Sequence, residues 1–167
     1  MTKPSICDFH SAAEEFCKLA GSSEPKSKND LWRIRELLLQ LIFHIPAVEN
    51  HQHDVERDGG DLSDEAFAEA VKGFQAFPFA YYRMVFDPHD LAAKDEPVVG
   101  MLFDDLADIY RDLFRGLDQW ESDHVDEACF DWSQSYSTHW GRHAVNALTA
   151  IETYRVDNHE RIEQPGE

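Results

Sequence analysis

Residues 131–154, with the sequence DWSQSYSTHWGRHAVNALTAIETY, read as one long amphipathic helix. A helix turns by about 100° per residue, so positions three and four apart share a face. One face of this helix is wide, apolar and aromatic, and it is expected to form a wall of the core. Its members, including one residue upstream, are Cys129, Trp132, Tyr136, Trp140, His143, Ala147, Ala150, Ile151 and Tyr154, with His139 at the edge.

His139 and His143 lie four residues apart, so one helical turn brings both imidazoles to the same side. This is the spacing of a helical pair of metal ligands. Trp140 stands where the zincin motif has its glutamate, so the pair does not belong to that motif. Two interpretations stay open: the imidazoles hold a metal ion, or they are structural side chains satisfied by carboxylates or backbone carbonyls.

A second stretch, residues 100–117 (GMLFDDLADIYRDLFRGL), predicts a helix that starts near residues 98–100 and packs on the first. Asp105 and Asp112 fall at one edge of its apolar face, and Asp108 lies slightly further out. Gly116 is interpreted as a local helix cap. The apolar face itself contains Leu102, Phe103, Leu106, Ile109, Tyr110, Leu113, Phe114 and Leu117.

If these two helices pack antiparallel, carboxylates meet imidazoles where the helices touch. One outcome is a direct Asp–His hydrogen bond, which would raise the histidine pKa and tie the helices together. The other is a divalent metal site for Zn, Mn or Fe, with His139, His143, Asp105 and Asp108 as candidate ligands. The further candidates for a pocket or helix contact at this place are Tyr110, Asp112, Trp132, Tyr136 and Trp140.

The rest of the chain also predicts helices. We expect them at about residues 5–20, from Asn29 or Asp30 to Pro46, and from Ser63 to about residue 74. Residues 80–86 are short and aromatic, either a helical turn or an extended piece, and no hairpin signal is present. The prediction is an all-α, single-domain bundle of five or more helices over residues 1–157, with a frayed polar tail at 158–167.

Composition limits the functions that are open to this chain. The net charge is −18, and residues 36–167 hold 9 Lys/Arg against 28 Asp/Glu. Such a surface repels nucleic acid and anionic lipid, and it suits a basic protein partner. Three cysteines without CxxC spacing, no signal peptide and no membrane-spanning run predict a cytoplasmic protein with reduced thiols. Gly-x-Ser-x-Gly, P-loop and GxGxxG motifs are absent, so neither a catalytic residue nor a nucleotide cofactor is assigned.

Two blocks, FDDLADIYRDLFRGL and THWGRHAVNAL, preceded by YRMVFDP, resemble a bacterial family known as domain of unknown function five-zero-six-three. The likeness is strongest over residues 78–152. It implies a small, soluble, all-helical protein and carries no activity. It also implies that Asp105, Asp108, Tyr110, Trp140, Gly141 and His143 belong to recognisable family blocks.

The function expected from the sequence is a non-catalytic protein-interaction module. Its basis is the acidic surface, the aromatic core and the absence of catalytic motifs. One alternative is a His/Asp metal-binding protein or metal-dependent enzyme, with a divalent metal as its cofactor. A second alternative is an acidic mimic of nucleic acid.

Overall fold

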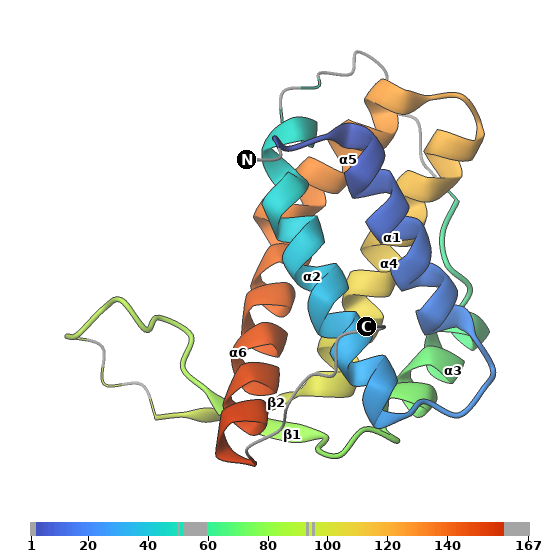
Figure 1. Cartoon of the computed structure of the whole chain (residues 1–167). Coiled ribbons are helices and arrows are strands. Elements are labelled where there is room, and N and C mark those ends of the chain that lie inside the picture. The colour runs from blue at the N-terminus through green and yellow to red at the C-terminus, as the bar shows by residue number, and fades with distance from the viewer. Residues whose placement is uncertain (1–2, 50, 52–59, 93, 95, 159–167) are drawn as a thin grey trace.

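The computed structural model describes residues 3–49, 51, 60–92, 94 and 96–158. The predicted all-α class is confirmed, with one small sheet added at one end of the bundle (Figure 1). Of the frayed tail predicted at residues 158–167, Asn158 is the C-cap of α6 and residues 159–167 lie outside the described residues. In chain order the elements are α1 (Ile6–Gly21), α2 (Lys28–Val48), α3 (Asp64–Phe74), β1 (Tyr81–Met84), β2 (Val98–Met101), α4 (Leu102–Glu121), α5 (Val125–Ser135), the π-helical turn η1 (Tyr136–Trp140) and α6 (Gly141–Asp157).

The start of α2 differs from the prediction, because neither Asn29 nor Asp30 is its cap. Ser27 is the N-cap: its hydroxyl accepts from the Asp30 N–H at 3.3 Å, and the Asp30 carboxylate accepts from the Ser27 N–H at 2.6 Å. This is a capping box that begins two or three residues earlier than expected. Ser63 is the N-cap of α3, as predicted, and Ser5 is the N-cap of α1, the helix expected at about residues 5–20.

Pro46 does not end α2, which continues to Val48. A proline lacks the N–H that would bond to the carbonyl four residues back, so it removes one hydrogen bond there. Ile45 and Val48, on either side of it, are both buried. Their burial keeps the last turn of the helix on the core despite the proline.

The small sheet is a feature that the sequence did not predict. β1 pairs antiparallel with β2, with Tyr82 opposite Gly100, so α4 begins at Leu102 instead of residues 98–100. The two strands are four residues each and are separated by residues 85–97. Hairpin signals in sequences come from loops of about two to five residues, which explains the miss.

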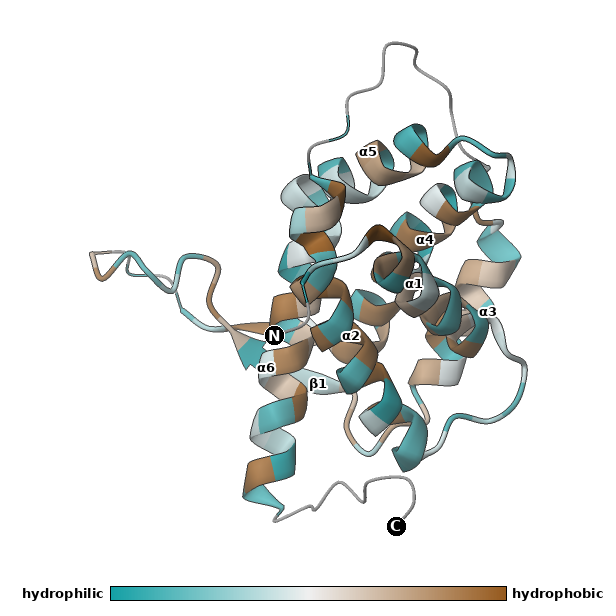
Figure 2. Cartoon of the chain, turned by 45° about the horizontal axis from the view of Figure 1, so that its top comes forward, coloured by the Kyte–Doolittle hydropathy of each residue, from teal (hydrophilic) through white to brown (hydrophobic). Residues whose placement is uncertain are grey.

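Trp132, Trp140 and Tyr110, the candidates for a pocket or helix contact, belong to the core. Trp132 and Trp140 are each 0% exposed and Tyr110 is 6% exposed. The Trp132 indole N–H donates to the Leu113 carbonyl at 3.0 Å, which ties α5 to α4. The helices carry hydrophobic and hydrophilic stripes (Figure 2), and their buried apolar side chains form one continuous cluster.

Gly116 is not a helix cap, because α4 continues through it to Glu121. A Cβ at Gly116 would lie 2.1 Å from Nε1 of Trp132. The glycine is therefore required by the indole that packs across α4 at this point.

The helix predicted over residues 131–154 is unbroken along the chain, but it bends between α5 and α6 (Figure 2) and is not uniformly α-helical. The turn η1 widens it between α5 and α6, and the Gly141 N–H donates to the Tyr136 carbonyl five residues back. A Cβ at Gly141 would lie 2.4 Å from that carbonyl oxygen. Gly141 therefore allows a close approach of the backbone within its own helix, where it permits the π turn.

Two expectations about the environment of the chain can be compared with the structure. Cys7, Cys17 and Cys129 are all free thiols. Among the described residues, no helix combines the length and the apolar character needed to cross a bilayer.

Candidate metal centre

The candidate site lies where α4 and α6 pack side by side. The Asp105 Oδ1 atom lies 2.7 Å from Nδ1 of His143, and Asp112 Oδ2 lies 2.7 Å from Nδ1 of His139. The earlier aspartate therefore meets the later histidine, so the two helices run antiparallel. Asp105 is 7% exposed, whereas both histidines are partly exposed.

These contacts define the state of both imidazoles. An ionised carboxylate accepts hydrogen bonds and donates none, so Nδ1 of each ring carries the proton. A neutral imidazole protonated at Nδ1 has its lone pair on Nε2. Asp112 and Asp105 therefore leave Nε2 of His139 and of His143 as the available ligand atoms.

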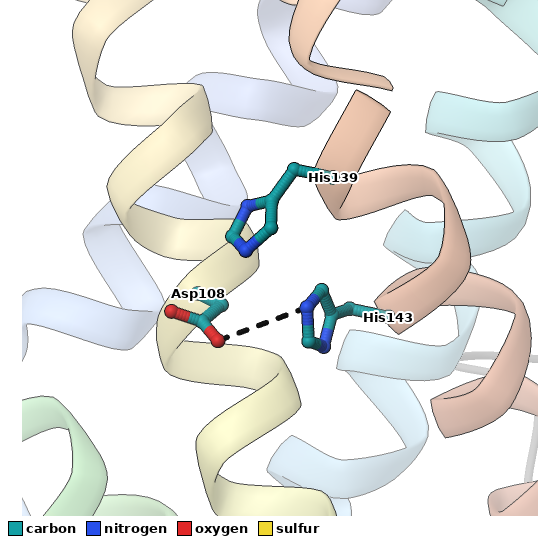
Figure 3. A group of neighbouring side chains, drawn as sticks. All are labelled: Asp108, His139 and His143. Atoms are coloured by element: carbon teal, nitrogen blue, oxygen red, sulfur yellow. Dashed lines mark ion pairs between the residues drawn. The ribbon is translucent and has the colours of Figure 1, made fainter. Parts of the chain in front are cut away.

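The available nitrogens and a third carboxylate converge. Nε2 of His143 lies 3.8 Å from Oδ2 of Asp108, and one ligand atom from each of Asp108, His139 and His143 lies within 4.8 Å of the other two. Figure 3 shows the rings of His139 and His143 extending from η1 and α6 towards Asp108 on α4. The ring centroids are 4.7 Å apart and the planes are tilted by 67°, so the rings meet at an angle and do not stack.

The π turn contributes to this arrangement. His139 lies inside η1 and His143 lies in the first turn of α6. A π turn adds a residue to the local helical repeat, which changes the direction of the side chains before it relative to those after it. Gly141 permits that turn, so it acts on the mutual orientation of the two rings.

Two carboxylates of the site, those of Asp108 and Asp105, are each held by a further side chain. Arg111 donates to Oδ1 of Asp108, and its guanidinium lies 4.7 Å from the centroid of the Phe67 ring. Tyr82 on β1 donates its hydroxyl to Oδ2 of Asp105. Ligands and supports fixed in this way are typical of metal sites in proteins.

The distances are compatible with a small divalent cation. Ligand atoms about 2.0–2.2 Å from a tetrahedral metal lie about 3.3 Å from one another. The 3.8 Å separation of His143 Nε2 and Asp108 Oδ2 is close to that value, and side-chain rotation can close the remaining gap. The side chains of His139, His143 and Asp108 are 41%, 25% and 13% exposed, so the centre is open to solvent on one side.

The electrostatics also favour a cation. Burial and the carboxylates of Asp108 and Asp105 raise the pKa of Asp104. Burial is the larger cause, and the contribution of the two carboxylates reflects crowded negative charge along α4, which a divalent ion would relieve. The hydrogen bond to Asp105 raises the pKa of His143, against the opposing effect of burial.

The raised pKa of His143 predicts how the stability of the metal-free protein depends on pH. Its pKa in the folded chain lies above the value of about 6.5 in the unfolded chain. The contribution of His143 is therefore fully present below pH of about 6.5 and is lost as pH rises through the folded pKa. Urea unfolding with a chelator present should show the advantage of the wild type over Asp105→Asn shrinking above that pH. A constant difference between pH 5.5 and 9 would contradict the prediction.

The residues named from the sequence thus fall into three groups. Asp108, His139 and His143 form the candidate ligand group, whereas Asp105 and Asp112 contact Nδ1 of the two rings. Tyr110, Trp132 and Trp140 lie in the core, and Tyr136 packs against Trp140 within η1 at 4.8 Å between ring centroids.

Two supporting residues were missed by the sequence analysis. Tyr82 was not among the candidate residues, because the hairpin that brings it to Asp105 was not expected. Arg111 was not among the candidate residues either; it lies on the exposed side of α4 but reaches back to Asp108 three residues earlier. The three-residue spacing of Asp108 and Arg111 is a signal that could have identified this pair.

The chain belongs to the family described as Domain of unknown function (DUF5063), whose model matches residues 2–157. The resemblance noted in the sequence is therefore confirmed, and it extends through both N-terminal helices. The fold is similar to that of protein BF1032 from Bacteroides fragilis, with a TM-score of 0.70, 15% identity, and coverage of 96% of this chain and 95% of that one. No match was found among the curated proteins.

Proposed function

We propose that this protein binds a divalent transition-metal ion through Oδ2 of Asp108 and Nε2 of His139 and His143. The observation that carries the proposal is the carboxylate on Nδ1 of each imidazole. A carboxylate in that position fixes the tautomer, orients the ring and makes Nε2 a better ligand. A pair of purely structural histidines would not need both Nε2 atoms near a third carboxylate.

The donor set indicates the class of metal. Two imidazoles and one carboxylate are the ligands of catalytic zinc sites and of non-haem iron sites, whereas Mg²⁺ and Ca²⁺ prefer oxygen alone. Three protein ligands on one side leave coordination positions for water or substrate. A metal ion in such a place activates water or polarises an oxygen of its substrate.

Metal analysis of the purified protein tests this proposal. Protein prepared without a histidine tag is stripped with a chelator and dialysed against Zn²⁺, Mn²⁺ or, without oxygen, Fe²⁺. We expect one ion per chain and a higher melting temperature in its presence, because the ion binds only the folded site. The paired variant His139→Ala/His143→Ala should lose both effects, and His89→Ala, an exposed loop histidine, should keep them. Absence of stoichiometric metal from the wild type, or its retention in the paired variant, would overturn the proposal.

We also propose a second function, which is binding of a basic protein at a groove between β1 and α6. The observation in its favour is an apolar groove of about 840 Å³ whose lining includes Phe79, Met84, Val145 and Thr149. Arg83 and Asp157 both lie in its wall, so the negative charge that favours a basic partner is that of the whole chain, −18. An apolar floor within an acidic surface suits a partner that offers apolar side chains surrounded by lysine or arginine.

Pull-down from the source cell tests this second function. The bait is the wild type, Thr149→Arg in the groove, or Gln134→Arg on the exposed face of α5, which makes the same charge change elsewhere. We expect a basic protein that is retained by the wild type and Gln134→Arg, is lost with Thr149→Arg, and weakens as salt rises. Recovery of the same proteins with all three baits would reject the groove as the binding surface.

A further inference from the structure

Tyr82 connects the hairpin to the candidate metal centre. Its hydroxyl donates to Oδ2 of Asp105, and Oδ1 of the same carboxylate accepts from Nδ1 of His143. The Asp105 carboxylate therefore has one oxygen on the hairpin and the other on a proposed metal ligand. Tyr82 lies 23 positions before Asp105, so this contact exists only because the chain folds back through β1 and β2.

The position of Tyr82 is fixed by the strand opposite it. In the register of the sheet Tyr82 faces Gly100, and a Cβ at Gly100 would lie 2.4 Å from Cζ of the Tyr82 ring. The ring therefore lies directly over the Gly100 backbone, which any larger residue would prevent. The Leu102 N–H also donates to the Ala80 carbonyl at 2.9 Å, so the base of the hairpin is tied to the start of α4.

The hydroxyl of Tyr82 is a constant donor. Burial, together with the hydrogen bond to Asp105, raises the pKa of Tyr82. The phenol therefore stays protonated at neutral pH, and the carboxylate that it contacts can only accept. Without the phenol, Asp105 would lose the contact that fixes its second oxygen, and its rotation would no longer be restrained from the hairpin side.

We infer that Tyr82 is a positioning residue for the metal ligand His143, so that metal affinity is coupled to the packing of the β1–β2 hairpin on α4. This inference rests on the proposed metal-binding function. Residues that orient metal ligands typically change metal affinity by 10–100-fold when they are replaced. Tyr82 acts through Asp105, so its effect belongs at the lower end of that range.

The coupling has a reciprocal consequence for the hairpin. If contact with Tyr82 raises metal affinity by some factor, bound metal stabilises the docked hairpin by the same factor. The amide hydrogens of β1 and β2 should then exchange more slowly when the metal is bound, in the regime where exchange proceeds through local opening. A residue that only filled space in the fold would not produce this metal-dependent protection.

Zn²⁺ affinity and hydrogen exchange of three proteins test the inference. Tyr82→Phe removes the hydroxyl and keeps the ring. Tyr81→Phe makes the same change on the neighbouring residue, whose ring packs edge-on against Phe103 at 5.8 Å between centroids and is 62% exposed. We expect about tenfold weaker Zn²⁺ binding for Tyr82→Phe, no change for Tyr81→Phe, and Zn²⁺-dependent slowing of hairpin exchange in the wild type and Tyr81→Phe alone.

The variant Gly100→Ala provides a second route, because it displaces the Tyr82 ring while the hydroxyl stays in the chain. It should weaken Zn²⁺ binding in the same direction, with circular dichroism confirming a folded helical protein. If the wild type fails to bind Zn²⁺, Mn²⁺ or Fe²⁺, the proposed metal function fails and the inference with it. If the wild type binds but Tyr82→Phe binds within about twofold of it, and Zn²⁺ leaves hairpin exchange unchanged, the inference alone is overturned.

Discussion

Asp108→Asn is expected to lower the affinity for a divalent metal ion by at least about 100-fold while leaving the metal-free protein folded. A zinc site contributes on the order of 10–16 kcal/mol in total, so each of three or four ligands carries about 3 kcal/mol, which corresponds to a factor of about 150. Asp108 is also the anionic ligand, so its replacement removes a charge that no other member of the Asp108–His139–His143 group supplies.

The same substitution should have a small effect on the free energy of unfolding without metal. It weakens the ion pair with Arg111, whose side chain is 44% exposed, and exposed ion pairs contribute about 0–1 kcal/mol. It also removes one of the carboxylates that raise the pKa of Asp104. Loss of the ion pair lowers the free energy of unfolding, whereas removal of a carboxylate near Asp104 raises it, so the two effects oppose each other. A large loss of affinity without a large loss of stability distinguishes a ligand from a residue that maintains the fold.

Isothermal titration with Zn²⁺ measures the affinity, and urea unfolding with a chelator measures the stability. Asp112→Asn should weaken binding by only about 10–100-fold, because Asp112 supports His139 from the far side of the ring. Glu69→Gln also removes an exposed carboxylate but lies on α3 beside Lys72, so it should leave affinity unchanged. If Asp108→Asn binds Zn²⁺ as the wild type does, Asp108 does not coordinate the ion.

The contact between α4 and α6 could be predicted because helical periodicity fixes it. Asp105 and Asp112 are seven residues apart, or about two turns, and His139 and His143 are about one turn apart. Residues at those spacings return to the same edge of a helix, and the apolar faces predict that the edges meet. The observed pairs, Asp105 with His143 and Asp112 with His139, follow from antiparallel packing of those edges.

The roles of the carboxylates could not be predicted from periodicity. Asp105 was a candidate both for a direct hydrogen bond to a histidine and for a metal ligand beside Asp108. It makes the hydrogen bond, to Nδ1 of His143, whereas Asp108 lies on the Nε2 side. Both positions are compatible with the same helical face. Which oxygen reaches which nitrogen depends on side-chain displacements of about an ångström. These displacements are set by the π turn and by Tyr82, neither of which the sequence indicated.

The two features missed by the sequence analysis share a cause, because each depends on a contact that local patterns do not encode. The turn η1 requires Gly141 to approach the Tyr136 carbonyl, and the hairpin requires Gly100 to lie beneath the Tyr82 ring. A glycine within a helical or extended pattern indicates that something comes close, but it does not say what. The identity of the neighbour appears only in three dimensions.

Gly116→Ala is expected to destabilise the protein by about 2–4 kcal/mol, although alanine is the better helix former. The new Cβ would lie 2.1 Å from Nε1 and 2.4 Å from Cε2 of Trp132. Trp132 is 0% exposed, and its indole N–H donates to the Leu113 carbonyl, so the ring cannot move without losing that bond. Overpacking costs about 1–3 kcal/mol and a buried unpaired donor costs about 1–3 kcal/mol, against a gain of about 1 kcal/mol in helix propensity.

Gly73→Ala is the matched control, because the same substitution within α3 meets no rigid neighbour. Its Cβ would lie 3.5 Å from Cε of Lys26, an ordinary contact with a flexible side chain. No clash then offsets the gain in helix propensity, so the free energy of unfolding should rise by a few tenths to about 1 kcal/mol. Urea unfolding of both variants followed by circular dichroism measures the two changes. If Gly116→Ala lowers the free energy of unfolding and Gly73→Ala raises it, the cost at Gly116 is due to the indole of Trp132. If both variants gain stability, Trp132 does not pack against α4 as described.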